Sequence, residues 1–319
     1  MLLRCLRWGL AGVLAGMLLT LTVFRAFGLE REWPLVPLFA FTPHLAVLAL
    51  AGACFAAWSR WWPEAVVTGA CAAILLVLLA PRVIPNRAPA DAPGVRLRVL
   101  AANVAGNDAA AQQVLEAVRR WDIDVFSAIE LTPEVALAYD ADGAQRLFPY
   151  RVLNPQPGYR GTGLYSRRPL QKRWPPLAVD FGLSAARLRL PGAAPVDVLA
   201  IHVPAPTTRL ASRRWRHDMR ELPSAGAAAA TRVLAGDFNA TLDHAELRRL
   251  LDRGYRDAAE QAGTGLRPTW PAGRQLVPTL VTIDHVLADR RVRVISARSV
   301  EIPGSDHRGV LAELLLPRR

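Results

Sequence analysis

The chain begins with three long apolar stretches and then changes to short apolar runs separated by polar residues. The stretches cover residues 8–27, 36–58 and 65–84. Each is close to the ~20 residues that an α-helix needs to cross the hydrocarbon core of a bilayer. Tryptophans mark their edges, as in the interfacial belts of membrane proteins: Trp33, Trp58, Trp61 and Trp62. The pattern predicts three transmembrane helices.

A cleavable signal peptide is the alternative interpretation of the first stretch, because the chain starts with the basic segment MLLRCLR. Two further apolar stretches follow directly, which favours an anchor that stays in place. Arginines near the span ends, which set orientation, are almost evenly divided between the two sides. One side has Arg4, Arg7 and Arg60, and the other has Arg25, Arg31, Arg82 and Arg87. Because the first span usually dominates, we expect a cytoplasmic N-terminus and an extracytoplasmic domain after the third span.

The Pro-rich segment NRAPADAPG separates the apolar part from the rest of the chain. Residues 1–90 hold seven arginines and three glutamates, and most of the charged residues come later. We therefore predict a membrane domain over residues 1–85, a semi-rigid linker over 86–94 and a globular domain over 95–319. A linker of this length reaches at most ~35 Å, which would keep the globular domain close to the bilayer.

Polar residues with useful chemistry follow, or lie within, the short β-branched runs of the globular part. The runs are VRLRVLAAN, DVFSAIE, VDVLAIH, TRVLAGDFN and VTIDHV, followed by GSDH. The polar residues are Asn103, Glu130, His202, Asp237, Asn239, Asp284, Asp306 and His307. Buried strands with polar ends present such side chains along one edge of a sheet. Each residue alone has an ordinary explanation as a turn residue or a hydrogen-bonded histidine, but the set predicts one site.

Charge and cysteine content narrow the chemistry. The formal net charge is +12, and Lys172 is the one lysine in the sequence. Arginine suits bidentate phosphate contacts, although a high arginine content can equally reflect genomic composition. A basic chain fits nucleic acid, anionic lipid head groups and phosphorylated small molecules alike. The three cysteines all lie in the first 71 residues, so the globular part has no thiol nucleophile, thiolate metal site or disulfide.

The ordered series LAAN, AIE, AIH, GDFN, TIDHV and GSDH resembles the endonuclease/exonuclease/phosphatase superfamily over about residues 95–317. This superfamily includes secreted DNases, abasic-site endonucleases, inositol polyphosphate phosphatases and neutral sphingomyelinases. The resemblance implies a four-layer α/β sandwich, with two mixed sheets packed face to face and helices outside. Three spans before such a domain further resemble the bacterial teicoplanin-resistance membrane proteins. One departure is Ile129, where many members have Gln.

The resemblance implies a divalent metal. Glu130 is the expected ligand of Mg²⁺ or Mn²⁺, because hard divalent cations prefer carboxylate and water oxygens. Asn103 is expected to support that ligand shell or to hold a phosphate oxygen, and Asp306 to add a further carboxylate.

The resemblance also implies roles in phosphoester hydrolysis. Asp237 is expected to activate or orient the attacking water, with Asn239 fixing the geometry. His307, held by Asp284, and His202 are expected to contact the scissile phosphate, since a carboxylate partner favours a charged imidazole.

Substrate contacts are expected on the rim of the site, from Arg160, Arg167 and Trp270. Arg160 and Arg167 lie in the segment YRGTGLYSRRPL, which is rich in glycine and arginine. Trp270 lies in LRPTWPAGRQLVP, which we expect to be an irregular loop. A basic helix around Trp215 could contact substrate or simply face solvent.

The leading interpretation is a Mg²⁺- or Mn²⁺-dependent phosphoesterase anchored in the cell membrane. Its substrate would be a phosphodiester, pyrophosphate or phosphomonoester that is lipid-linked or close to the membrane. A membrane-anchored nuclease is the alternative, supported by net charge and arginine content. A non-enzymatic scaffold is disfavoured because the carboxylate and imidazole sets are both present. The sequence indicates no obligate protein partner.

Overall fold

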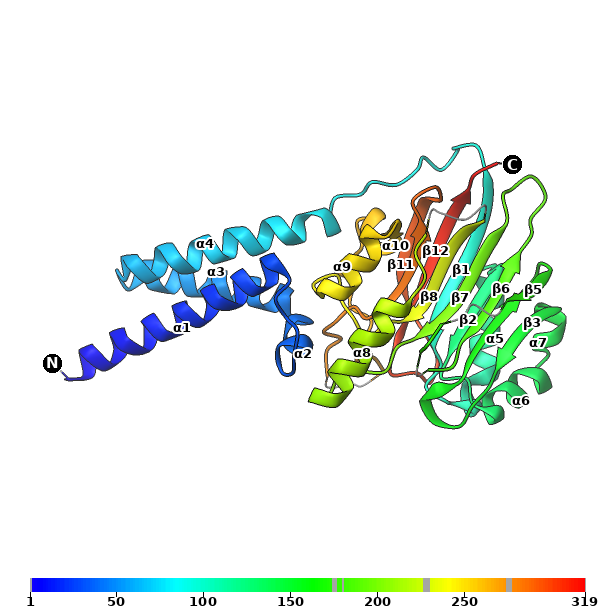
Figure 1. The fold of residues 1–319 in the computed structure, drawn as a ribbon, viewed down its shortest axis with the longest axis horizontal. Helices are drawn as coiled ribbons and strands as arrows, with labels where there is room; N and C mark the ends of the chain where they lie inside the picture. The colour runs from blue at the N-terminus through cyan, green and yellow to red at the C-terminus, as the bar shows by residue number, and fades with distance from the viewer. Residues whose placement is uncertain (1, 174–176, 180, 226–229, 274–276, 319) are drawn as a thin grey trace.

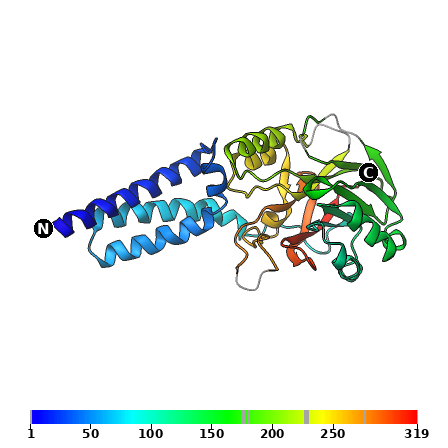
Figure 2. The ribbon, with the colours of Figure 1, turned by 90° about the horizontal axis from the view of Figure 1, so that it is seen from below.

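The computed structural model describes residues 2–173, 177–179, 181–225, 230–273 and 277–318. A bundle of helices from the first part of the chain projects from a globular α/β part (Figure 1). The N-terminus lies at the far end of this bundle, and the C-terminus lies on the globular part (Figure 2). The bundle consists of α1 (Leu2–Phe27), α2 (Leu35–Phe39), α3 (Thr42–Trp58), α4 (Trp62–Leu79) and the 3-10 turn η1 (Ala80–Arg82).

Among the residues that the structure describes, two segments are long and apolar enough to cross a membrane, Gly9–Phe27 and Trp62–Arg82. The expected continuous span over residues 36–58 is wrong, because the chain breaks there into α2 and the 17-residue apolar α3. Proline explains the restart: Pro43 lies in the first turn of α3, where its missing N–H costs no helical hydrogen bond.

The described residues of the globular part form two six-stranded mixed sheets. The first has the order β11-β12-β1-β2-β4-β3, and the second has the order β5-β6-β7-β8-β10-β9. The first sheet is formed by β1 (Val95–Asn103), β2 (Val125–Ile129), β3 (Tyr150–Asn154), β4 (Thr162–Ser166), β11 (Arg293–Glu301) and β12 (Arg308–Leu316). The second is formed by β5 (Leu170–Arg173), β6 (Ser184–Leu188), β7 (Val196–His202), β8 (Thr231–Asp237), β9 (Tyr255–Asp257) and β10 (Asp284–Asp289).

Helices cover the outer faces of the sheets, which confirms the predicted layers of sheets flanked by helices. They are α5 (Ala111–Arg120), α6 (Pro133–Ala141), α7 (Ala144–Leu147), α8 (Arg209–Glu221), α9 (Ala245–Asp252) and α10 (Ala258–Gln261), with 3-10 turns η2 (Asp108–Ala110) and η3 (Gly158–Arg160). Because strand side chains alternate in direction, Val99 of β1 packs between the sheets while Leu100 packs under the helices. Likewise, Val233 of β8 faces inward and Leu234 faces Trp215 of α8.

Strand direction gathers the polar strand ends at one edge. β1 runs parallel to β2, and β7 runs parallel to β8, so four carboxyl ends meet there. β12 and β10 run antiparallel to β1 and β8, so they bring their amino ends to the same edge. Three of the polar residues therefore precede or open a strand instead of ending one. Asp284 opens β10, and Asp306 and His307 precede β12.

The helical bundle is joined to the globular part by a buried cluster of charges. Asp243, before α9, accepts from Arg25 of α1 at 2.6 Å and from Arg82 of η1 at 2.6 and 2.7 Å. The Asp243 side chain is fully buried, and each arginine side chain is 5% exposed. Burial alone would raise the pKa of the Asp243 carboxyl, but the hydrogen bonds and charges of Arg82 and Arg25 outweigh it and lower that pKa.

The predicted linker over residues 86–94 is hydrogen-bonded to the globular part. The N–H of Asn86 donates to the carbonyl of Gln261 at 2.8 Å, and the N–H of Ala88 donates to the carbonyl of Val294 at 2.7 Å. Ala88 is buried. These contacts hold part of the segment against the globular part.

Replacing Asp243 with Asn should weaken the joint between the bundle and the globular part. The change removes the carboxylate from two buried arginines, and breaking a buried ion pair typically costs about 3–5 kcal/mol. We expect the full chain in detergent to unfold at a clearly lower temperature, measured by circular dichroism. The matched control is Asp252→Asn, at an exposed carboxylate at the end of α9. Equal unfolding temperatures for the two variants would contradict this role.

Candidate active site

An amide and two carboxylates come together at the edge where the two sheets meet. Nδ2 of Asn103 donates to Oε1 of Glu130 at 2.9 Å and lies 3.4 Å from Oδ2 of Asp237. Asn103 ends β1 and Glu130 follows β2, whereas Asp237 ends β8 of the other sheet. Oδ1 of Asn103 accepts the N–H of Ala105 at 2.9 Å, which fixes the amide plane. This amide therefore connects the two halves of the sandwich.

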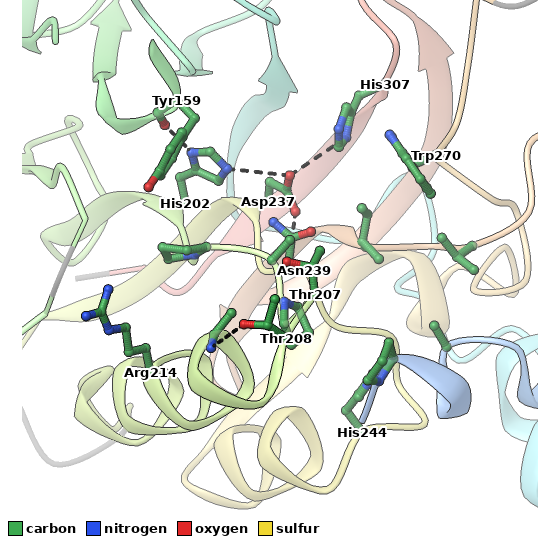
Figure 3. A pocket seen from close by; sticks show the side chains of 18 of the residues that line it. Tyr159, His202, Thr207, Thr208, Arg214, Asp237, Asn239, His244, Trp270 and His307 are labelled. Atoms are coloured by element: carbon green, nitrogen blue, oxygen red, sulfur yellow. Dashed lines mark hydrogen bonds and ion pairs between the residues drawn. The ribbon is translucent and has the colours of Figure 1, made fainter. Parts of the chain in front are cut away.

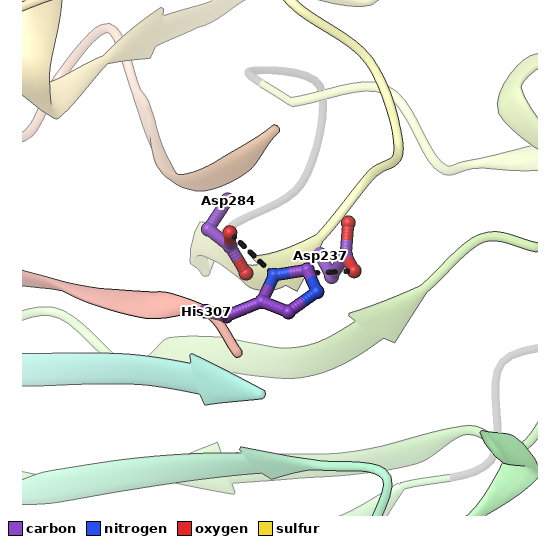
Figure 4. A group of neighbouring side chains, drawn as sticks. All are labelled: Asp237, Asp284 and His307. Atoms are coloured by element: carbon purple, nitrogen blue, oxygen red, sulfur yellow. Dashed lines mark hydrogen bonds and ion pairs between the residues drawn. The ribbon is translucent and has the colours of Figure 1, made fainter. Parts of the chain in front are cut away.

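Asp237 lies beside a second carboxylate and an imidazole (Figure 4). It is paired in register with Asp284 of β10. Nδ1 of His307 bonds to Oδ2 of Asp284 at 3.0 Å and lies 3.8 Å from Oδ2 of Asp237. Burial and the charge of Asp284 raise the pKa of the Asp237 carboxyl to about 6. Burial alone would lower the pKa of His307, but Asp284, with Asp237 and Asp306 nearby, raises it to about 10.

His202, at the end of β7, approaches the carboxylates of Asp237 and Glu130 (Figure 3). Its Nδ1 lies 2.6 Å from the carbonyl oxygen of Tyr159. A carbonyl can only accept, so Nδ1 carries the proton and Nε2 faces the carboxylates. Nε2 lies 3.7 Å from Glu130 and 3.8 Å from Asp237. The main chain of Tyr159 therefore sets the tautomer that His202 presents.

Unusual backbone geometry holds two of these residues in place. Glu130 has φ 59° and Asn239 has φ 46°, in the left-handed region that costs about 1–3 kcal/mol for residues other than glycine. Asn239 donates its N–H to Oδ1 of Asp237 at 2.8 Å and its side-chain amide to the carbonyl of Val203 at 2.9 Å. Such strain concentrates at functional sites, where the surrounding strands over-determine the conformation.

The glycine of the GDFN motif is required by close packing of strands. A Cβ on Gly236 would lie 2.0 Å from the carbonyl oxygen of Ile201 on the neighbouring β7. That distance is far shorter than a carbon–oxygen contact allows, and the φ of Gly236 is +154°. A residue without a side chain therefore lets β8 place Asp237 against His202.

The donor set suits a hard divalent cation. Four carboxylates border the site: Glu130, Asp237, Asp284 and Asp306. Among the described residues, Oδ1 of Asp284 is buried with no hydrogen-bond partner. The ligand atoms of Asp237, Asp284 and His307 lie within 4.8 Å of one another, so this group could hold a metal ion. An excess of carboxylate oxygen over cationic groups is the environment that Mg²⁺ and Mn²⁺ prefer.

The site opens into a pocket of ≈ 710 Å³. Trp270 lines it, with its ring 6.4 Å from that of His307 and its Nε1 3.4 Å from Oδ2 of Asp306. Residues before α8 and in its first half also line it, including Thr208 and Arg214 (Figure 3). A further wall comes from the helical bundle: Pro37, Ala40 and Phe41.

The two predicted arginine contacts lie at opposite ends of one strand. Arg160 immediately precedes the β4 region and is exposed at the edge that holds the site. Arg167 follows β4 at the other edge, where it pairs with Asp122. A strand rises about 3.3 Å per residue, so the intervening residues carry Arg167 away from the cluster of carboxylates and imidazoles. We therefore leave Arg167 out of the proposed site.

Several positioning groups were not predicted from the sequence. Oγ of Ser305 donates to the carbonyl of Asn103 at 2.7 Å and accepts the N–H of His307 at 2.9 Å. Oγ1 of Thr269 accepts the N–H of Asp284 at 3.2 Å. The serine of the GSDH motif was visible as a signal, but a main-chain carbonyl such as that of Tyr159 leaves no trace in residue type.

Similarity to known proteins is found for the fold and for the motifs. The model of the Endonuclease/Exonuclease/phosphatase family matches residues 100–307, which contain all the strand-end motifs. No curated protein matches the chain. An endonuclease/exonuclease/phosphatase from Beutenbergia cavernae DSM 12333 is 19% identical, with a TM-score of 0.52 over 69% of this chain and 72% of that one.

Two further solved structures share the fold. TDP2 from D. rerio, solved with a single-strand DNA product, is 20% identical with a TM-score of 0.53 over 69% of this chain and 98% of that one. TDP2 from C. elegans is 17% identical with a TM-score of 0.55 over 70% of this chain and 76% of that one. These identities support the likeness of fold alone, whereas the family model spans most of the chain. The chain belongs to the Endonuclease/Exonuclease/phosphatase family.

Proposed function

We propose that the protein is a membrane-anchored phosphoesterase that depends on Mg²⁺ or Mn²⁺. The observation that carries this proposal is the joining of Glu130 and Asp237, from different sheets, through Asn103. Together with two imidazoles, this cluster supplies the groups that hydrolysis of a phosphoester anion needs. Such an anion repels a nucleophile, so catalysis requires positioning and charge neutralisation.

Each side chain has a role that follows from its contacts. Asp237, whose Oδ1 is held by the N–H of Asn239, can orient a water and accept its proton through Oδ2. His307, held by Asp284 as an imidazolium, can donate from Nε2 to a phosphoryl oxygen. His202, whose Nδ1–H is held by Tyr159, can do the same when its Nε2 is also protonated. These donors would be strongest in the transition state, where negative charge on those oxygens develops.

Glu130 would hold the divalent metal, with Asn103 orienting its carboxylate and Asp306 facing the same pocket. The bound ion would neutralise phosphoryl oxygens as a Lewis acid. The cluster of Asp237, Asp284 and His307 is the alternative location. Nδ1 of His307 is already hydrogen-bonded to Asp284, which favours a catalytic role for this cluster over metal binding.

We propose that α1, α3 and α4 all cross the cell membrane. The apolar α3 spans about 26 Å at 1.5 Å per residue, slightly less than the ~30 Å hydrocarbon core. Its outward side chains are apolar and strongly exposed, including Val47 at 68% and Leu48 at 64%. Exposed apolar surface of this extent is typical of contact with lipid. The resemblance to teicoplanin-resistance membrane proteins stays a prediction.

The pocket lining favours a lipid-linked or membrane-proximal phosphoester over a nucleic acid. Among the described residues that line the pocket, Arg214 is the single arginine, and no lysine joins it. A polynucleotide track needs a series of cations and stacking aromatic side chains. The alternative of an anchored nuclease keeps two supports: the net charge of +12, and the DNA product bound to the D. rerio TDP2 of similar fold.

Hydrolysis should require a divalent cation. We expect purified full-length protein in detergent to cleave a polyprenyl pyrophosphate, to lose activity in EDTA and to recover it with Mg²⁺ or Mn²⁺. Glu130→Gln should lower the rate by at least about 10²-fold, without recovery at high metal concentration. Glu116→Gln, at an exposed position on α5, is the matched control. Full wild-type activity in excess chelator would refute metal dependence, and cleavage of plasmid DNA alone would establish the nuclease.

Asp237→Asn should reduce turnover without unfolding the protein. The amide keeps the shape of the carboxylate but cannot accept a proton, so we expect a loss of about 10²–10⁴-fold in kcat. The unfolding temperature should not fall, because the substitution removes a charge that burial and Asp284 disfavour. Asp197→Asn, on β7 at the opposite end from His202, serves as the control. A near-wild-type kcat for Asp237→Asn would remove this residue from water activation.

The catalytic domain should face the extracytoplasmic side. The N-terminus and the globular part lie at opposite ends of the bundle (Figure 2), and the basic N-terminal end is expected in the cytoplasm. Alkaline phosphatase fused after Arg319 should therefore be active in cells, and a fluorescent reporter that folds in the cytoplasm should stay dark. A fusion after Arg60, in the turn between α3 and α4, should give the reverse pattern. Interchanged results would place the site in the cytoplasm.

A further inference from the structure

The segment that joins α1 to α3 is built into the catalytic part of the molecule. Val36 of α2 is fully buried in the same apolar cluster as Trp215 and Phe238. Its carbonyl oxygen lies 2.8 Å from Nε2 of His244. Nδ1 of His244 accepts the N–H of Thr241 at 2.8 Å, so Nε2 must carry the proton that binds Val36.

Electrostatics and packing support the same fixed position. Burial lowers the pKa of His244 to about 4, so the ring is neutral and keeps this tautomer at physiological pH. The ring also meets Trp215 edge to face, with centroids 5.4 Å apart. Glu30, earlier in this segment, accepts the N–H of Ala245 at the start of α9. The segment is therefore held at several points, and Figure 3 shows His244 beside its ribbon.

Beyond Val36, the segment forms a wall of the active-site pocket. Pro37, Ala40 and Phe41 line the same cavity as Glu130 and Asp237. Apolar residues from elsewhere in the chain continue this wall: Pro204, Ala205, Pro206, Leu210, Val281 and Ile283. The cavity of ≈ 710 Å³ is thus lined both by carboxylates and imidazoles and by apolar side chains. A phosphoryl group would fill a small part of it, which leaves the apolar region for the rest of the substrate.

The apolar region adjoins the helices proposed to lie in lipid. Phe41 directly precedes α3, whose outward side chains, such as Val47 and Leu48, are apolar and exposed. A hydrocarbon chain leaving the pocket over Phe41 would meet this surface next. Hydrocarbon gains from apolar contact in proportion to the area removed from water, whereas a sugar or a second phosphate would lose its hydrogen bonds with water there.

We infer that residues 37–41 form an apolar subsite that binds the hydrocarbon chain of an amphiphilic phosphoester while its phosphorus group lies between Glu130 and Asp237. This inference rests on the proposed function and adds the part of the site that selects the substrate. The active site is thus incomplete without the N-terminal bundle, which supplies a wall as well as an anchor.

The test uses p-nitrophenyl alkyl phosphates with ethyl, butyl and hexyl chains, the full-length protein in detergent, and Mg²⁺. For the wild type, kcat/KM should rise with chain length, by up to about fourfold for each methylene that is buried. Ala40→Phe fills the subsite and should lower the hexyl-to-ethyl ratio of kcat/KM by about tenfold or more. Ala51→Phe makes the same change at an exposed position on α3 and should leave the ratio unaltered.

A second variant and a binding measurement keep subsite and catalysis separate. Phe41→Ala removes part of the apolar wall and should also lower the hexyl-to-ethyl ratio of kcat/KM. Unfolding temperatures verify that each variant is folded. Hexylphosphonate, which has no ester bond, should bind the wild type more tightly than methylphosphonate by calorimetry, and Ala40→Phe should abolish the difference. Unchanged ratios and unchanged phosphonate preference in both variants would overturn the subsite while leaving the hydrolase intact. No hydrolysis of any ester, with phosphonate preference retained, would instead overturn the proposed function.

Discussion

The register of β8 between β7 and β10 is the constraint on which the site depends. It sets Asp237 opposite His202 on one side and opposite Asp284 on the other. A slip of one residue would turn Asp237 away from both neighbours, because side chains alternate along a strand. The close approach of Gly236 to the main chain of β7 fixes this register from within the motif itself. The geometry of the candidate site is a consequence of this strand pairing.

Packing of the two sheets adds the second half of the site. Oγ of Ser127 on β2 donates across the core to the carbonyl of Ala235 on β8 at 2.8 Å. This buried bond lies close to the edge where Asn103 bridges Glu130 and Asp237, so the two carboxylates are held at a set separation. Buried carboxylates repel one another, and their imidazole neighbours offset part of that repulsion. The same crowding makes the cluster suited to a divalent cation.

The N-terminal bundle is joined to the globular part by buried polar contacts as well as by the chain. Arg25 and Arg82 come from helices α1 and η1, yet both meet Asp243 beside α9. Buried charges are stable only when paired, so this junction fixes the bundle in one orientation. That orientation sets α2 against His244 and brings Phe41 to the pocket. The N-terminal bundle and the candidate site are therefore joined by direct contacts.

The sequence by itself determined the fold, the family and the polar residues of the site, because each strand carries its motif locally and in order. It also determined that the N-terminal part is apolar and helical, but not that residues 36–58 break into two helices. Tertiary structure alone decided which end of β4 faces the site, and so separated Arg167 from it. It also decided that residues 37–41 reach the pocket and that main-chain oxygens hold His202 and His244. Those contacts join residues that are distant in sequence, and the oxygens belong to main-chain carbonyls, which every residue has. A local pattern of residue types therefore cannot predict them.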